Sequence, residues 1–238
     1  MHEEVGMLSV RGVSKSFRGL KAVNKVDLEV RQGEVIGLIG PNGAGKTTLF
    51  NIISGRIKPD EGTVQFNGEN ITGLRPNVIA MKGLQRTHQI VKPFMEMTVR
   101  ENLMIPFHKK SRKEIDEVLG FLGIAEHADE LAKNLTFPSQ KKLELGRILV
   151  SDPKMILLDE IASGLNPSEI VEYIDLIRQI QSQGITIILV EHIIHFVKEL
   201  SDRIMVMDLG TKIAEGTPEE VLKDPKVLTA YLGDSYGE

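Results

Sequence analysis

The sequence predicts an α/β fold with an additional antiparallel β portion and an inserted α-helical segment. Short apolar runs of strand length precede segments with helical spacing, which is typical of α/β proteins. Alternating and turn-rich segments near the N-terminus predict antiparallel strands, and helical spacing prevails in the middle of the chain. We therefore expect one domain, residues 1–238, with an α/β core at 1–89 and 151–238 and a helical subdomain at 90–150.

The N-terminal segment predicts a strand pair that leads into a buried strand. Polar and apolar residues alternate within residues 8–36, and residues 31–34 form a polar turn. The apolar run at residues 35–39 then has the length of a buried strand. Residues 59–73 combine short apolar pieces with glycine, proline and acidic residues, which predicts further strands and turns.

Residues 40–47, Gly40-Pro41-Asn42-Gly43-Ala44-Gly45-Lys46-Thr47, fit the phosphate-binding loop pattern G-x-x-x-x-G-K-[ST]. An apolar strand precedes this loop, and apolar residues at helical spacing follow it up to Gly55. Glycines let backbone N–H groups approach phosphate oxygens, and the helix N-terminus adds a positive dipole end. Lys46 can reach the outer phosphates of a nucleotide, and Thr47 can ligate Mg²⁺. The alternative, a glycine-rich turn with a solvated lysine, does not account for the flanking strand and helix.

The middle of the chain has helical character. The apolar residues that share helical spacing there are Ile115, Val118, Leu119, Leu122, Ala128, Leu131 and Ala132. A basic cluster precedes them at Lys109, Lys110, Arg112 and Lys113. We expect this cluster to be a solvated helix start or loop, with a binding patch as the alternative.

From Met155 the alternation of strand and helix returns. Residues 155–158 and 185–190 are predicted buried strands, and residues 167–181 are a predicted helix with Pro167 near its start. Residues 204–207 predict another strand, and Gly210 offers a hairpin turn. With the phosphate-binding loop, these elements specify a phosphate-loop NTPase core with a mixed, RecA-like sheet.

Two acids, Asp159 and Glu160, end the apolar strand at residues 155–158. In phosphate-loop NTPases an aspartate at such a strand end holds Mg²⁺, directly or through water. A carboxylate next to it can orient the attacking water or take its proton. A strand that simply exits to solvent is the alternative.

The composition excludes several classes of protein. The net charge of −4 argues against a broad nucleic-acid footprint, and the absence of cysteine excludes disulfides, thiol catalysis and zinc–cysteine sites. No apolar run approaches the roughly 20 residues of a membrane helix, so we expect any membrane association to depend on partners.

Further motifs make the chain resemble the ATP-binding subunits of ABC transporters over nearly its full length. Gln89 matches the Q-loop glutamine, Ser163-Gly164-Leu165-Asn166-Pro167 matches the D-loop, and His192 matches the switch histidine. Phe17 stands where this family places an aromatic that stacks on adenine. The resemblance implies that the chain binds ATP and Mg²⁺ and couples ATP hydrolysis to transport.

The resemblance also implies roles for individual residues. Lys46 would bridge the outer phosphates, Glu160 would act on the water, and His192 would contact the γ-phosphate. The residues implied to bind the nucleotide are Phe17, Gly40, Asn42, Gly43, Ala44, Gly45, Lys46, Thr47, Thr48 and Thr136. Those implied to approach the metal are Thr47, Gln89 and Asp159, and those implied to act in hydrolysis are Glu160, His192 and Gln89.

A narrower resemblance concerns the transported solute. Residues 17–23, 191–192, 214–221 and the tail at 231–233 resemble the ATPases of branched-chain amino-acid importers, in particular the longer of the two ATPases that such importers use. ATPases of lipopolysaccharide export share the C-terminal part and are the alternative. A soluble ABC protein of translation or DNA repair fits less well, because such proteins usually carry two ATPase units or a long coiled-coil insertion.

The signature loop departs from the family pattern. The family has Leu-Ser-Gly-Gly-Gln or Leu-Ser-Tyr-Gly-Gln, whereas this chain has Leu135-Thr136-Phe137-Pro138-Ser139. Pro138 replaces a glycine whose N–H would face phosphate, and proline has no such donor. Proline is nonetheless well tolerated in the first turn of a helix.

The resemblance implies several partners. In this family the signature loop of one subunit completes the ATP site of the other, so a homodimer would carry the Pro138 defect in both sites. A heterodimer with a second, intact ATP-binding subunit is therefore favoured, and a nucleotide-gated clamp that hardly turns over is the alternative. Membrane permease subunits would hold the protein at the cytoplasmic face of the cell membrane, and a solute-binding protein would act indirectly. We expect residues around 90–110 and the helical insertion to face the permeases.

Overall fold

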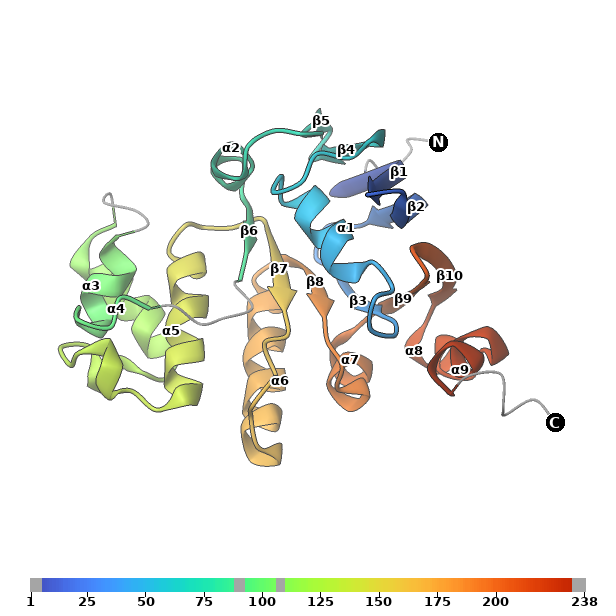
Figure 1. The fold of residues 1–238 in the computed structure, drawn as a ribbon. Helices are drawn as coiled ribbons and strands as arrows, with labels where there is room; N and C mark the ends of the chain where they lie inside the picture. The colour runs from blue at the N-terminus through green and yellow to red at the C-terminus, as the bar shows by residue number, and fades with distance from the viewer. Residues whose placement is uncertain (1–5, 88–92, 106–109, 233–238) are drawn as a thin grey trace.

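The computed structural model describes residues 6–87, 93–105 and 110–232 (Figure 1). The strands are β1 (Leu8–Phe17), β2 (Leu20–Val30), β3 (Val35–Ile39), β4 (Glu61–Phe66), β5 (Glu69–Asn70), β6 (Leu84–Arg86), β7 (Met155–Asp159), β8 (Thr186–Val190), β9 (Arg203–Asp208) and β10 (Thr211–Gly216). The helices are α1 (Lys46–Ile53), α2 (Pro76–Met81), α3 (Val99–Met104), α4 (Arg112–Phe121), α5 (Phe137–Leu149), α6 (Pro167–Ser182), α7 (Ile194–Leu200), α8 (Pro218–Val221) and α9 (Pro225–Leu232). Two short 3-10 turns, η1 (Ala125–His127) and η2 (Ala132–Asn134), precede α5.

A mixed six-stranded sheet lies at the centre, in the order β10-β9-β3-β8-β7-β6. The neighbours from β9 to β6 are parallel, and β10 is antiparallel to β9. Leu209 and Gly210, which join β9 to β10, both have positive φ, 43° and 81°, as a type I′ hairpin turn requires. The predicted α/β class, mixed sheet and hairpin at Gly210 are confirmed.

A second, antiparallel sheet has the order β2-β1-β4-β5. β1 and β2 are the strand pair predicted within residues 8–36, and β4 and β5 lie in the segment predicted as strand and turn at 59–73. In Figure 1 this sheet lies beyond α1, on the opposite side of the central sheet from α6. Its buried residues form one apolar cluster with α1 and the adjoining face of the central sheet.

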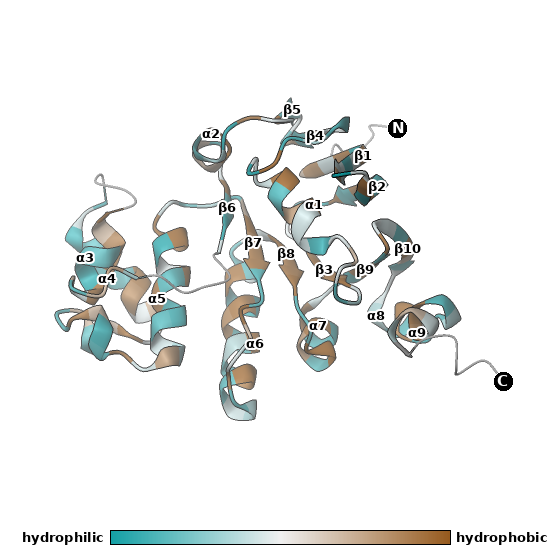
Figure 2. Ribbon diagram, viewed as in Figure 1, coloured by the Kyte–Doolittle hydropathy of each residue, from teal (hydrophilic) through white to brown (hydrophobic). Residues whose placement is uncertain are grey.

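Strict alternation along the central strands produces two cores. In β7, Ile156 and Leu158 belong to the cluster on the side of α5, α6 and α7, whereas Met155 and Leu157 belong to the cluster on the side of α1. β3 and β8 divide their side chains in the same way, because successive residues of a strand face opposite sides of the sheet. Figure 2 accordingly shows these central strands largely in brown. A parallel sheet buried on both faces explains why its strands read as continuous apolar runs.

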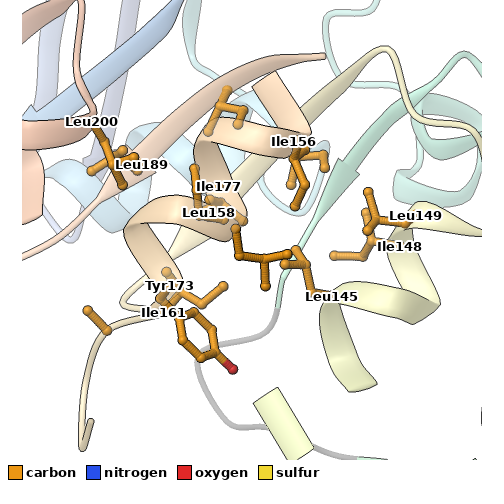
Figure 3. Close-up of a cluster of buried hydrophobic side chains, with 14 of the residues drawn as sticks. Leu145, Ile148, Leu149, Ile156, Leu158, Ile161, Tyr173, Ile177, Leu189 and Leu200 are labelled. Atoms are coloured by element: carbon orange, nitrogen blue, oxygen red, sulfur yellow. The ribbon is translucent and has the colours of Figure 1, made fainter. Parts of the chain in front are cut away.

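Helix α6 packs against the sheet through its apolar face. In Figure 3, Tyr173 and Ile177 of α6 lie beside Leu158 of β7 and near Leu145 of α5. Complete burial of a large apolar side chain of this kind stabilises the fold by about 1.5–3 kcal/mol. Pro167 occupies the first turn of α6, as the sequence predicts, and Asn166 caps the helix.

The helical segment contains α3, α4 and α5, which contact one another on one side of the sheet (Figure 1). The prediction of a helix through Ala128, Leu131 and Ala132 is wrong, since only the short turns η1 and η2 form there. Gly123 adopts a left-handed φ of 67° just after α4, and Leu131 is extended, so helical hydrogen bonding cannot continue. Ala128 and Ala132 are nevertheless buried in the core.

The basic cluster is a solvated helix start, as predicted. Ser111 caps α4, Lys110 forms ion pairs with Glu114 and Asp152, and Lys113 faces Glu117. Lys109 lies outside the described residues. In the part of the chain that the structure describes, no helix has the length and apolar character needed to cross a bilayer.

Gly37 in the middle of β3 provides a test of the packing between the sheet and α7. A Cβ at Gly37 would lie 2.6 Å from Ser201 Oγ and 2.6 Å from Val197 Cγ1. We expect Gly37→Ala to lower the free energy of unfolding by about 1–3 kcal/mol, measured by urea denaturation. Gly120→Ala is the matched control, because a Cβ there meets nothing within 4 Å and alanine favours the helix by up to about 1 kcal/mol. Equal stabilities of the two variants would contradict the close approach of α7 to β3.

Candidate functional site

The loop between β3 and α1 has a backbone that only glycine accommodates at two positions. Gly40 has φ 148° and Gly45, immediately before α1, has φ 100°. A Cβ would lie 2.0 Å from the Met207 carbonyl oxygen at Gly40 and 2.2 Å from the Ala22 carbonyl oxygen at Gly45. The loop therefore packs closely against β9 and β2. This packing fixes the position of the N-terminus of α1, which follows the loop.

Lys46 is held inside this loop by backbone carbonyl groups. Its Nζ donates to the Gly40 oxygen at 2.6 Å and to the Pro41 oxygen at 3.0 Å. Burial lowers the pKa of Lys46, and the negative charge of Glu160 opposes this lowering. The ammonium group thus lies at the loop with partners that a phosphate oxygen can replace.

A pocket of about 200 Å³ opens in front of the loop. The predicted residues that line it are Asn42, Gly43, Ala44, Gly45, Lys46, Thr47, Thr48, Glu160 and His192. Ala22, which the sequence analysis does not identify, completes the lining. The structure therefore brings the phosphate-binding loop, the second acid and the switch histidine to one place, with the N-terminus of α1 directed at it.

The acid and the histidine in this pocket contact each other directly. Glu160 follows β7 and His192 follows β8, which are neighbouring parallel strands, and Asp159 is in register with Val190. The Glu160 Oε1 and His192 Nε2 atoms are 3.0 Å apart. Glu160 has a left-handed backbone, with φ 51°, and its N–H donates to the Val190 carbonyl oxygen at 2.9 Å. This geometry suits a carboxylate that orients water beside an imidazole.

The first acid, Asp159, lies behind the pocket rather than in its lining. It is buried, and its Oδ2 atom accepts from the Arg86 Nη2 at 2.6 Å. Arg86 also donates to Asn51 at 2.7 Å and to Ser54 at 3.1 Å, both on the α1 side. Sequence reasoning does not find Arg86, because no motif includes it and its partner is 73 positions away. The parallel pairing of β6 with β7 is what brings the two charges together.

A magnesium ion would find few protein ligands here. Among residues 6–87, 93–105 and 110–232, no group of three or more histidine and carboxylate side chains is arranged to hold a metal. Hydroxyl and carboxylate oxygens with phosphate oxygens are nevertheless the donors that Mg²⁺ prefers, and it usually keeps several waters. Thr47 in the pocket and Asp159 behind it fit this incomplete protein shell.

Four of the predicted site residues that the structure describes are not in the pocket lining: Phe17, Gly40, Thr136 and Asp159. Phe17 ends β1 with its ring partly exposed, and the Lys15 ammonium lies 5.8 Å from the ring centroid. Thr136 precedes α5, where its hydroxyl donates to Ser139 Oγ at 3.1 Å. Gln89 lies outside the described residues.

The signature segment begins α5. Pro138 occupies the first turn, and its carbonyl oxygen accepts from the Tyr173 hydroxyl at 2.7 Å. The proline ring is therefore compatible with the helix, and the missing N–H is the chemical difference from a glycine at this position.

Known proteins are similar to this sequence over nearly its whole length. A family model described as "ABC transporter" matches residues 23–163, and one described as "Branched-chain amino acid ATP-binding cassette transporter" matches residues 211–237. The high-affinity branched-chain amino acid transport ATP-binding protein LivG of Salmonella typhimurium is 41% identical, with 96% of this chain and 98% of the relative covered. BraF of Pseudomonas aeruginosa, named with the same activity, is 38% identical at the same coverage.

Solved structures agree with these sequence matches. The ADP conformation of an ATP-binding cassette of an ABC transporter superposes with a TM-score of 0.89 at 35% identity, over 96% of this chain and 99% of that chain. A nucleotide-free ATP-binding cassette superposes with a TM-score of 0.88 at 34% identity and the same coverage. The chain therefore belongs to the ABC transporter family, as one of its ATP-binding domains.

Proposed function

We propose that this protein is the ATP-hydrolysing subunit of an ABC importer for branched-chain or related amino acids. The observation that carries the proposal is that Lys46, Thr47, Glu160 and His192 line the same pocket. The similarity to LivG and BraF and the match at residues 211–237 support the amino-acid importer rather than lipopolysaccharide export. The solute is not chosen by this chain, because the proposed site binds only the nucleotide.

The phosphate-binding loop would hold the triphosphate. Backbone N–H groups from Gly43 to Lys46 point to the β-phosphate in this proposal, and Lys46 exchanges the Gly40 and Pro41 carbonyl groups for outer phosphate oxygens. Thr48 approaches the α-phosphate. Phe17 reaches the adenine from outside the pocket, as its partly exposed ring allows.

Magnesium would neutralise charge on the phosphates when bound. Thr47, Gln89 and Asp159 are the residues that we propose to hold it. Asp159 already balances Arg86, so a contact with the metal through water preserves that ion pair, whereas direct coordination would compete with it.

Glu160 and His192 would carry the hydrolysis. The carboxylate of Glu160 orients the attacking water or accepts its proton, and His192 contacts the γ-phosphate. Their side chains are 3.0 Å apart and line the same pocket as Lys46. A nucleotide-gated clamp with little turnover is the second candidate, and the observation that favours it is the missing N–H of Pro138.

We further propose a heterodimer with a second ATP-binding subunit, attached to membrane permeases at the cytoplasmic face of the cell membrane. The defect in the signature segment falls on the partner's nucleotide, so an intact partner leaves one complete site built on this chain's Glu160. The helical part at residues 90–150 would lie toward the permeases, since Phe94 and Met95 expose 44% and 38% of their surface there.

Glu160→Gln tests the hydrolytic role. We expect ATP binding to persist, because the phosphate-binding loop is unchanged, and turnover to fall by about 10²–10⁴-fold, because the amide cannot accept the proton. Steady-state ATPase assays and nucleotide titration measure the two effects. Glu219→Gln, at an exposed position, is the matched control. Unchanged turnover of Glu160→Gln would exclude Glu160 as the catalytic carboxylate.

Repair of the signature segment tests the heterodimer. In the variant Phe137→Gly/Pro138→Gly/Ser139→Gln we expect a modest rise of the ATPase rate with the partner subunit, because one further site becomes competent. A gain of about 10²-fold for the isolated chain would instead indicate a homodimer, if a phosphate donor contributes about 3 kcal/mol. No gain in either setting would show that Pro138 is compatible with a working signature loop.

Crosslinking tests the permease contact. The chain contains no cysteine, so single-cysteine variants at positions 94–97 report on these positions alone. We expect crosslinks from them to a permease subunit. We expect none from a cysteine at position 219 in α8, which lies at the opposite end of the molecule from α3 and α4 (Figure 1). Crosslinks from other surfaces with none from positions 94–97 would contradict the proposed orientation.

A further inference from the structure

The peptide group between Ile161 and Ala162 is held at both ends by buried side chains of opposite charge. Lys141 Nζ donates to the Ile161 carbonyl oxygen at 2.7 Å. Glu191 Oε1 accepts from the Ala162 N–H at 2.7 Å. Lys141 is 5% exposed and Glu191 is 2% exposed, so neither contact is shared with bulk water. The cation faces the negative end of the peptide dipole and the carboxylate faces its positive end.

Burying two ionisable side chains costs desolvation free energy, which is a high cost if they only satisfy the hydrogen bonds of one peptide group. Burial raises the pKa of Glu191 to about 7 and lowers the pKa of Lys141, although the negative charges of Glu191, Glu144 and Glu160 oppose the shift of Lys141. Neutral donors and acceptors satisfy most buried peptide groups at lower desolvation cost. Charge-assisted hydrogen bonds are, however, stronger and fix geometry more tightly.

The held peptide lies close in the chain to Glu160, one of the two residues that we propose to act on the nucleotide. It begins one residue after Glu160, whose left-handed backbone it follows. Glu191 directly precedes His192 in the chain, and its carboxylate accepts from the Ala162 N–H, so this residue links the segment after Glu160 to the switch histidine. The relative position of Glu160 and His192 therefore depends on Glu191.

Lys141 adds a third element, the beginning of α5. Its ammonium group lies 5.2 Å from the ring centroid of Phe137 in the signature segment. The side chain of Ile161 is packed beside Tyr173 in the apolar cluster (Figure 3), and the Tyr173 hydroxyl bonds to Pro138 of the same segment. Residues of the signature segment therefore contact the side chains that hold Ile161 or pack beside it.

We propose that Lys141 and Glu191 are positioning residues for ATP hydrolysis, which together fix Glu160 against His192 and tie both to the signature segment. The proposal rests on the proposed roles of Glu160 and His192. Neither Lys141 nor Glu191 lines the pocket, so both act through other residues. A displacement of reacting groups by about 1 Å is enough to lower a rate by about 10²-fold.

The test uses the purified full-length chain, with its partner subunit where turnover requires it. Glu191→Gln keeps the size and an acceptor but removes the charge, and Lys141→Met keeps the length but removes the donor. We expect each to lower kcat by about 10–100-fold with KM for ATP and nucleotide affinity within about threefold of wild type. Lys141→Arg should recover part of the loss, and Lys142→Met, at the neighbouring position, is the matched control.

Combination with Glu160→Gln decides whether the pair acts through Glu160. The variant Glu160→Gln/Glu191→Gln should be no slower than Glu160→Gln, because residues that act as a unit are not additive. Multiplied losses, or kcat unchanged in Glu191→Gln and Lys141→Met despite lowered thermal midpoints, would overturn the proposal. If Glu160→Gln itself retains wild-type turnover, the proposed function fails instead, so the two failures are distinguishable. If Glu191→Gln does not fold, Lys141→Met and Lys141→Arg decide alone.

Discussion

Parallel pairing of β3, β8 and β7 is the constraint on which the site depends. Leu38 of β3 is in register with Val190 of β8, and Val190 is in register with Asp159 of β7. Because the strands are parallel, each carboxyl end lies at the same edge of the sheet. Gly40, Glu160 and His192 follow within two residues of these ends. Three segments far apart in the sequence thus meet without any long loop.

This constraint also explains how much of the fold could be predicted. Strands buried on both faces have to be apolar throughout, so the runs at 35–39, 155–158 and 185–190 were visible as strands. Their parallel order follows from the helices between them. The helical segment was harder to predict. Ala128 and Ala132 are buried at helical spacing, but the left-handed Gly123 and the extended Leu131 interrupt the helix around them.

The candidate site also contains residues that could be predicted from the sequence and contacts that could not. The phosphate-binding loop and the acidic pair were predictable, because their chemistry fixes residue types at adjacent positions. The partners of those residues were not. Arg86 contacts Asp159, and Lys141 contacts Ile161, through strand register and helix packing that leave no spacing pattern in the sequence. Only the folded chain shows that the carboxylates behind the pocket have cationic counterparts.

This balance of charge has a physical reason. Three cations and three carboxylates lie around this edge of the sheet, namely Lys46, Arg86, Lys141, Asp159, Glu160 and Glu191. Four of these side chains, Lys46, Lys141, Asp159 and Glu191, are buried. Buried charges of one sign would destabilise the native state by several kcal/mol, so each carboxylate requires a donor nearby. A phosphate group that binds Lys46 therefore has to displace the carbonyl oxygens of Gly40 and Pro41 as its partners.

The left-handed backbone of Glu160 has a consequence for protein engineering. A non-glycine residue at φ 51° costs roughly 1–2 kcal/mol relative to glycine, so the native state is less stable than its packing permits. Glycine at this position would relieve the strain and remove the carboxylate in one step. Selection for thermostability alone would therefore favour glycine at this position, at the expense of the carboxylate that we propose for hydrolysis. A stabilised version of this protein has to gain its stability at positions remote from the edge where β7 ends.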